Sequence, residues 1–215
     1  MLSVHGRKTA SVVIEPVARK LLDAGLTPNA VTLVGTIIPV ITALVLIPLD
    51  LLVPAALIIG LISALDMVDG TMARLSGGGT RFGATFDASC DRITDGAIFA
   101  AITWWLVYVH DAHQAVVAAS FGVLVASQVI SYIKARGEAS RLRMVGGLIE
   151  RPERLIIGLV GLGLQGFGVP YALEIAIWVL LIGSVFTVGQ RFHMALTSPN
   201  GRERIAPPVE TRAQR

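Results

Sequence analysis

Four aspartates stand in two otherwise apolar stretches of this 215-residue chain, at a spacing that suits metal-dependent chemistry. Asp66 and Asp69 lie three residues apart, and Asp87 and Asp91 lie four apart, so each pair would share one face of a helix. An aspartate at the centre of a membrane helix costs about 2.5 to 3.5 kcal/mol, so the group requires compensating charge. Four carboxylates favour two Mg²⁺ or Mn²⁺ ions. The alternative is a proton or ion relay in a transporter.

The two stretches that carry these aspartates are expected to be antiparallel helices, because only the short loop 76–80 joins them. In each pair one aspartate is farther from that loop, Asp66 in the first and Asp91 in the second. At about 1.5 Å per residue, these two would lie roughly 13 to 15 Å from the loop. The four carboxylates would therefore meet at a similar depth. Asp95 continues the face of the second pair by one more turn, and we expect it to hydrogen-bond inside the bundle.

The composition indicates an all-α integral membrane bundle of six transmembrane helices. Hydrophobic residues make up 53% of the chain and charged residues 15%, against about 25% charged in a typical soluble domain. This excludes a disordered chain, a coiled coil and a typical cytosolic enzyme, and the single cysteine excludes an intramolecular disulfide. The six expected spans are residues 30–49, 51–75, 82–109, 114–134, 155–169 and 172–195.

Two polar segments flank the spans. Ser11 to Leu22 mixes apolar and charged residues in a pattern that predicts an amphipathic helix lying in the membrane interface. The chain is thus expected to divide into a juxtamembrane segment (1–27), a six-helix domain (28–196) and a cytoplasmic tail (197–215).

The basic residues predict the orientation in the cell membrane. All 18 Lys and Arg residues lie before the first span, around the second loop, between the fourth and fifth spans, or towards the end of the chain. The opposite loops contain none, so both termini and the active site of this multi-pass protein are expected on the cytoplasmic side. The formal net charge of +3 thus reflects topology, and no nucleic-acid partner is expected.

The residues around the four aspartates resemble the signature of the CDP-alcohol phosphotransferase family, D-x2-D-G-x2-A-R-x8-G-x3-D-x3-D. All eight fixed positions agree from Asp66 to Asp91, without a gap. The six spans and the amphipathic start are also similar to that family, so the resemblance covers residues 1 to about 196. It implies a membrane transferase that uses two divalent cations, Mg²⁺ or Mn²⁺, and forms a homodimer.

The resemblance also implies roles for single residues. Asp66, Asp69 and Asp87 would bind metal, and Asp91 would be both a metal ligand and the general base. The residues implied to bind CDP-diacylglycerol are Asn29, Ala30, Val31, Thr32, Gly70, Ala73, Arg74 and Thr80.

The residue types of the signature also fit a nucleotide substrate. Gly70 and Ala73 lack bulk, so a nucleotide could approach the helix backbone, and Arg74 could hold a phosphate by charge-assisted hydrogen bonds. Gly83 would allow close packing one turn before the second pair of aspartates. An ion transporter has no need of these positions, so they favour the transferase.

Three cations enter the bundle from different helices. Lys134 ends an apolar run, Arg154 begins the fifth span and Arg191 lies inside the sixth. Together they predict a pocket for a phosphorylated acceptor. The alternative is that they only enforce topology and contact anionic lipid.

The acceptor is expected to be inositol 1-phosphate. The stretches Ser131–Arg136 and Arg151–Arg154 resemble the branch of the family that uses this acceptor, which adds Ser131 to the predicted acceptor site. The expected reaction transfers the phosphatidyl group of CDP-diacylglycerol to inositol 1-phosphate and releases CMP. Glycerol 3-phosphate is the alternative acceptor, as in a phosphatidylglycerophosphate synthase, because it is also anionic.

Overall fold

The computed structural model describes residues 14–64 and 66–204, apart from the side chain of Asp66. The described part of the chain is helical throughout, with no strand, as expected. Residues 14–23 form a first helix. The helices that follow are α2 (Pro28–Leu46), α3 (Leu52–Ala64), α4 (Asp66–Leu75), α5 (Arg81–Tyr108), α6 (Gln114–Ala139), α7 (Arg151–Gly166) and α8 (Ala172–Thr197).

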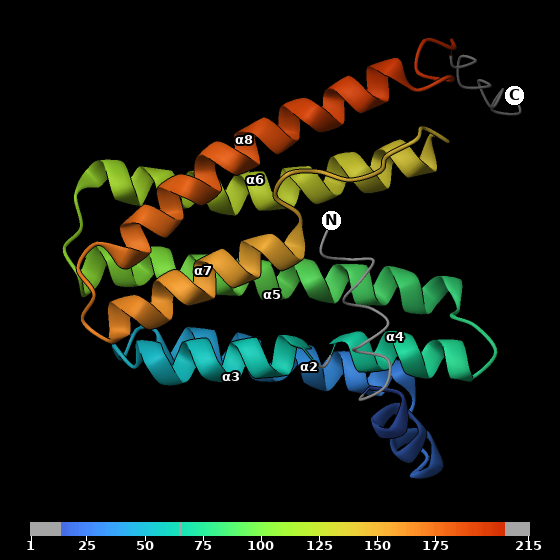
Figure 1. Cartoon of the computed structure of the whole chain (residues 1–215), viewed down its shortest axis with the longest axis horizontal. Helices are drawn as coiled ribbons and strands as arrows, with labels where there is room; N and C mark the ends of the chain where they lie inside the picture. The colour runs from blue at the N-terminus through green and yellow to red at the C-terminus, as the bar shows by residue number, and fades with distance from the viewer. Residues whose placement is uncertain (1–13, 65, 205–215) are drawn as a thin grey trace, which may run out of the picture.

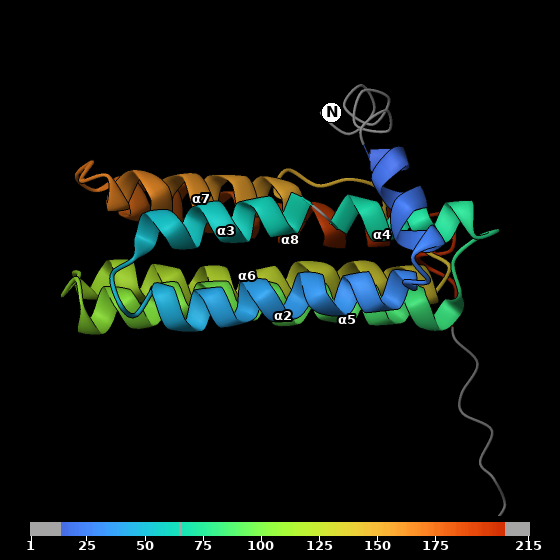
Figure 2. The same ribbon diagram turned by 90° about the horizontal axis from the view of Figure 1, so that it is seen from below.

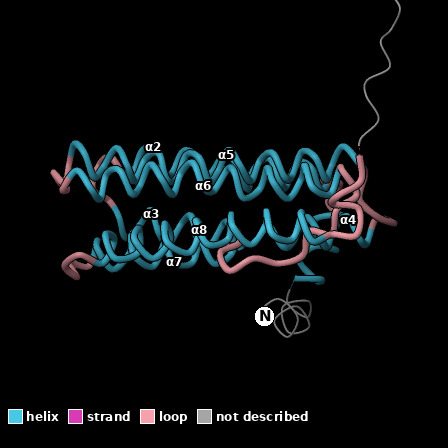
Figure 3. The backbone as a smooth tube through the Cα atoms, turned by 90° about the horizontal axis from the view of Figure 1, so that it is seen from above, coloured by secondary structure: helices cyan, strands magenta, loops and turns pink. Residues whose placement is uncertain are grey.

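The helices pack in two layers (Figures 2 and 3). One layer holds α2, α5 and α6, and the other holds α3, α7 and α8, with α4 continuing the line of α3 (Figure 1). The layers meet where α8 lies on α6 and where α3 and α4 lie on α2. The loops without Lys or Arg all lie at one end of the bundle, opposite the loop that joins α4 to α5 (Figure 1).

The core lies between these layers and is built from aliphatic and aromatic side chains. Ile98, Phe99, Ile102 and Leu106 follow one face of α5 and are at most 1% exposed. Their spacing of three to four residues is that of a helix face turned to the interior. At the other end of the bundle, Ala18 of the first helix packs with two residues of α4. This contact seats residues 14–23 against the end of the bundle.

Within the described residues, four segments are long and apolar enough to cross a membrane by length and composition: α2, the run Leu52–Leu75, α6 and α8. The run Leu52–Leu75, expected as one span, comprises α3 and α4. The other two expected spans correspond to α5, whose first half carries charged residues, and to α7, which has only 16 residues. Helices thus correspond to all six expected spans, and four of these six segments meet the criterion of length and apolar composition.

Several expected boundaries were wrong, for reasons that lie in the caps. The first span begins at Pro28 and not at residue 30, because the Thr27 hydroxyl accepts a hydrogen bond from the backbone nitrogen of Ala30. The helix at the position of the expected fifth span begins at Arg151 and not at residue 155, because Glu150 and Glu153 form a capping box at its start. The fourth continues to Ala139. Lys134 therefore lies inside a helix and not at its end.

The segment between α6 and α7 runs back along the bundle before α7 begins (Figure 3). Two backbone nitrogens of this segment donate hydrogen bonds to hydroxyl groups. The nitrogen of Ile149 donates to Oγ1 of Thr187 on α8 at 2.9 Å, and the nitrogen of Arg143 donates to Oγ of Ser198, just after α8, at 3.0 Å. Gly183 makes room for Ile149, since a methyl group on Gly183 would lie 2.6 Å from Cγ1 of Ile149. This return path places the first residues of α7 well inside the bundle.

Candidate active site

A cavity of about 920 Å³ lies between the first half of α5, the second half of α6, the start of α7 and α8. Five cationic side chains and three carboxylates line it, so positive charge is in excess. Asp91 and all four residues of the predicted acceptor site, Ser131, Lys134, Arg154 and Arg191, are among the lining residues. Residues from three helices, distant in the sequence, therefore share one cavity with the predicted base.

Two of the cavity arginines are buried with part of their hydrogen-bonding capacity unused. Arg154 is fully buried and Arg191 is 2% exposed. Arg191 donates to a carboxylate oxygen of Glu150 at 2.8 Å. Among the described residues, Nε and Nη1 of both arginines have no hydrogen-bond partner. Buried donors of this kind are costly unless a ligand or water satisfies them, so the cavity is suited to an anion.

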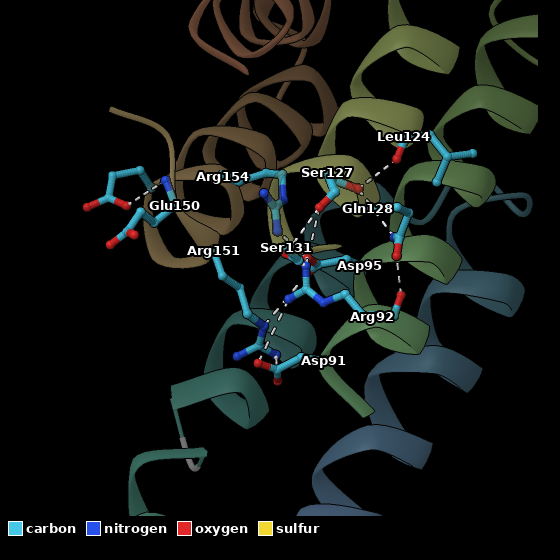
Figure 4. Close-up of polar contacts among 11 residues, drawn as sticks. Asp91, Arg92, Asp95, Leu124, Ser127, Gln128, Ser131, Glu150, Arg151 and Arg154 are labelled. Atoms are coloured by element: carbon cyan, nitrogen blue, oxygen red, sulfur yellow. Dashed lines mark hydrogen bonds and ion pairs between the residues drawn. The ribbon is translucent and has the colours of Figure 1, made fainter. Parts of the chain in front are cut away.

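The predicted base, Asp91, faces two arginines (Figure 4). Nη2 of Arg151 lies 3.0 Å from Oδ1 of Asp91, and Nη2 of Arg92 lies 3.9 Å from Oδ2. The side chain of Asp91 is 23% exposed, so water and small solutes can still reach it. The carboxylate is thus held at the edge of the cavity.

Asp95 lies one turn deeper on α5 and is fully buried. Its carboxylate accepts a hydrogen bond from Arg154, which confirms the expectation that Asp95 bonds inside the bundle. Arg92 and Arg151 also lie within 4 Å of it, at 3.4 Å and 3.7 Å. One buried carboxylate therefore contacts three of the five cavity cations.

The predicted metal ligands lie on two helices: Asp66 and Asp69 in the first turn of α4, and Asp87 and Asp91 in the first half of α5. Asp69 is 6% exposed and accepts hydrogen bonds from the Thr32 hydroxyl and the Gly70 backbone nitrogen, both at 2.5 Å. Asp87 is half-buried on α5, one turn before Asp91. The side chain of Asp66 lies outside the described part of the structure. Within that part, no three His, Cys, Asp or Glu side chains gather closely enough to hold an ion. The four-carboxylate site stays a prediction.

Two of the predicted nucleotide residues, Asn29 and Thr80, meet beside Gly83. A methyl group on Gly83 would lie 3.2 Å from Oδ1 of Asn29 and 3.1 Å from Oγ1 of Thr80. The Thr80 hydroxyl also caps α5 by accepting a hydrogen bond from the Gly83 nitrogen at 2.9 Å. The absence of a side chain at Gly83 thus lets α2 approach the start of α5 closely.

The remaining predicted nucleotide residues lie in two different surroundings. Arg74 is exposed at the end of α4, where it donates to the Thr71 hydroxyl at 2.8 Å. Ala73 lies one residue earlier and is half-buried. Ala30 and Val31, in contrast, line an apolar cavity of about 260 Å³ between the first helix, α2 and α3. These two residues are therefore placed to contact an apolar group.

Four charged residues of the large cavity have no predicted role: Arg92, Glu138, Glu150 and Arg151. For Arg92 a signal exists, because it follows the predicted base and precedes Asp95 by three residues, a spacing at which helical side chains meet. For Glu150 and Arg151 the sequence offers no comparable signal. They reach the cavity only because the segment before α7 runs back into the bundle.

Comparison with known proteins agrees with this architecture. Residues 25–189 match the profile described as CDP-alcohol phosphatidyltransferase. The phosphatidylinositol phosphate synthase of Corynebacterium glutamicum is 60% identical over 213 residues, which cover 99% of this chain and 97% of that protein. The phosphatidylinositol phosphate synthase of Mycobacterium tuberculosis is 50% identical over 199 residues, 91% of each chain.

Solved structures of the Mycobacterium tuberculosis enzyme share the fold. The crystal structure with CDP-DAG bound has a TM-score of 0.86 and 49% sequence identity, and covers 91% of this chain and 99% of that one. The crystal structure in complex with manganese and citrate has a TM-score of 0.85 at 49% identity, covering 90% and 93%. With a profile match over most of its length and relatives at 50 to 60% identity, this chain belongs to the CDP-alcohol phosphatidyltransferase family.

Proposed function

We propose that this chain transfers the phosphatidyl group of CDP-diacylglycerol to inositol 1-phosphate, giving phosphatidylinositol phosphate and CMP. The observation that carries the choice of acceptor is the single cavity that joins Asp91 to five cations, two of them buried arginines with unused donors. A phosphate monoester brings up to two negative charges and several acceptor oxygens, which such donors can satisfy. A neutral alcohol would leave them unpaired. The relatives named above are phosphatidylinositol phosphate synthases by name, which supports this product.

Asp91 is the proposed general base. It would accept the proton of an inositol hydroxyl while the hydroxyl oxygen attacks the phosphorus that bears the diacylglycerol. That oxygen forms the new bond, the bond between the two phosphates breaks, and CMP leaves with the electron pair. Lys134, Arg154 and Arg191, with the Ser131 hydroxyl, would hold the acceptor phosphate so that the hydroxyl stays close to Asp91.

The proposed cofactors are two divalent cations, Mg²⁺ or Mn²⁺, held by Asp66, Asp69, Asp87 and Asp91. The chemistry of this donor set supports the assignment, because it consists of carboxylate oxygens, which these hard ions prefer. Thr32 and the Gly70 nitrogen already orient the carboxylate of Asp69. When bound, the ions would neutralise the diphosphate and stabilise charge on the leaving oxygen.

The donor substrate is expected to lie across α2, α4 and the start of α5. Asn29, Thr32 and Thr80 offer polar groups to the cytidine and its phosphates, and Arg74 offers a guanidinium next to the small residues Gly70 and Ala73. Ala30 and Val31 border the apolar cavity and would contact the lipid part. The positions of polar and apolar side chains thus follow the amphiphilic character of CDP-diacylglycerol.

The proposed topology is a multi-pass cell-membrane protein with six spans: α2, α3 with α4, α5, α6, α7 and α8. Residues 14–23 would lie in the membrane interface. Both termini and the active site would face the cytoplasm. The loops that lack Lys and Arg support this orientation, because they lie together at the end of the bundle opposite the loop between α4 and α5 (Figure 1). Homodimer formation stays an expectation from the family resemblance.

The test is an assay of purified protein with labelled CDP-diacylglycerol and Mg²⁺ against three acceptors. Inositol 1-phosphate should give phosphatidylinositol phosphate and CMP, with glycerol 3-phosphate and free inositol far less active. A preference for glycerol 3-phosphate would instead make the chain a phosphatidylglycerophosphate synthase. A preference for free inositol would contradict the assignment of the cationic cavity to a phosphate.

A further inference from the structure

We propose that Asp95 is a positioning residue for acceptor binding. It orients Arg92, Arg151 and Arg154, the three arginines that lie between the proposed base, Asp91, and the proposed binding site of the acceptor phosphate. The inference rests on the proposed function for the identity of the acceptor. It adds to that function a residue that lies outside the family signature and does not itself line the cavity.

The contacts of Asp95 converge from two helices (Figure 4). Arg154 of α7 donates to Oδ2, and Nη1 of Arg92 lies 3.4 Å from the same oxygen. On the other side, Nε of Arg151 lies 3.7 Å from Oδ1. All three arginines line the cavity, whereas Asp95 is buried behind them. Any effect of Asp95 on the acceptor therefore passes through these arginines.

Each arginine connects Asp95 to a different part of the site. Arg151 reaches Asp91 with Nη2, so its guanidinium bridges the two carboxylates. Arg92 donates to the hydroxyl of Ser131, one of the predicted acceptor residues. Arg154 turns one side of its guanidinium to Asp95 and keeps Nε and Nη1 without a described partner. The carboxylate thus engages all three guanidinium groups and leaves two donors of Arg154 for a ligand.

The three arginines need a carboxylate such as Asp95 between them for a physical reason. Three guanidinium groups this close repel one another in a medium of low polarity, and long arginine side chains have many rotamers to choose from. A central carboxylate offsets the repulsion and selects one arrangement before the acceptor arrives. Pre-organised donors bind an anion more tightly, because the cost of ordering them is met in folding and not in binding.

The experiment compares Asp95→Asn with Asp95→Glu in the purified full-length protein. Asp95→Asn keeps the shape but removes the charge, so the KM for inositol 1-phosphate should rise about tenfold or more, as for loss of charge-assisted contacts. The KM for CDP-diacylglycerol should stay within about twofold, and the increase in Tm that inositol 1-phosphate causes in the wild type should be lost. Asp95→Glu restores the charge one methylene further out, so its acceptor KM should lie between the two.

The matched control is Thr103→Val, a buried position on the same helix whose hydroxyl bonds to Ser120 at 2.7 Å, away from the arginines. It should lower Tm and leave the acceptor KM unchanged. An Asp95→Asn variant with a lowered Tm but a normal acceptor KM would overturn the positioning role. So would an Asp95→Glu variant no better than Asp95→Asn, because restoring the negative charge would then not restore acceptor binding.

Two further outcomes keep the proposal testable. If Asp95→Asn does not fold, Asp95→Glu alone is compared with the wild type, and an unchanged acceptor KM overturns the inference. If the wild type prefers another phosphorylated polyol, the proposed function fails, and the same variants are measured with that acceptor. A raised KM there would still support the positioning role, and an unchanged one would overturn it.

Discussion

The guanidinium of Arg151 lies 3.0 Å from the carboxylate of Asp91, joining the first residue of α7 to the predicted base on α5. The two side chains are 19% and 23% exposed, so the pair is largely shielded from water. A shielded ion pair holds its partners in one geometry more firmly than an exposed one. The orientation of Asp91 towards the cavity thus depends on a helix distant in the sequence.

Replacement of Arg151 should therefore slow the chemistry more than it weakens donor binding. Arg151→Gln removes the charge but keeps a polar side chain at the helix start. We expect kcat with inositol 1-phosphate to fall about tenfold or more, from loss of the charged contact to Asp91, while the KM for CDP-diacylglycerol hardly changes. Steady-state kinetics with each substrate varied measures both. An unchanged kcat would show that Asp91 needs no help from α7.

Asp91→Asn separates binding from transfer. The amide keeps an oxygen donor but cannot accept the hydroxyl proton at neutral pH. The variant should bind CDP-diacylglycerol in the presence of Mn²⁺ and transfer almost nothing to inositol 1-phosphate. Equilibrium binding of labelled donor, run beside the transfer assay, tests this. Loss of binding along with transfer would assign Asp91 a chiefly structural or ligand role.

The metal assignment predicts a selective effect at Asp87. Asp87→Asn removes one negative ligand, so Mn²⁺ affinity, measured by the electron paramagnetic resonance of free Mn²⁺, should fall together with transfer, while the protein still folds. Asp111→Asn is the matched control, because Asp111 lies in the loop at the opposite end of the bundle. Equal Mn²⁺ binding by wild type and Asp87→Asn would contradict the two-metal site.

The acceptor cavity is best tested at Lys134, which is only partly buried and can be changed with little risk to folding. Lys134→Met keeps the length and removes the charge. The KM for inositol 1-phosphate should rise roughly ten- to hundredfold, the range expected for a charge-assisted contact, and the KM for CDP-diacylglycerol should stay constant. Arg143→Gln, an exposed position outside the cavity, should behave like the wild type. Equal losses at both positions would indicate a role in topology or folding.

Gly83 offers a test of the nucleotide side. In Gly83→Ala the new methyl group would lie 3.1 to 3.2 Å from Thr80 and Asn29, so one of them must move. The KM for CDP-diacylglycerol should rise severalfold, with the KM for inositol 1-phosphate unchanged. Gly79→Ala is the control, since a methyl group there meets nothing within 4 Å. If the two variants behave alike, the close approach of α2 to α5 has no part in donor binding.

Much of the fold follows from local sequence alone. Long apolar runs and the turn before α5 are properties of a few neighbouring residues, and they predict the helices within a few positions. The spacing of four residues likewise places Asp87, Asp91 and Asp95 on one face of α5. The boundaries that were wrong, at the starts of α2 and α7 and the end of α6, lie at caps formed by neighbouring residues, which the apolar runs alone do not reveal.

The tertiary structure alone decided which cations meet the predicted base, Asp91. Asp95 and Arg154 are 59 residues apart, and Arg151 reaches Asp91 because residues 143–149 bond along α8 and carry the start of α7 into the bundle. Side-chain periodicity determines which face of a helix is polar, but it does not determine which distant face packs against it. That choice arises from the shape of the whole bundle, where glycines such as Gly183 admit one particular neighbour and buried charges must find their partners.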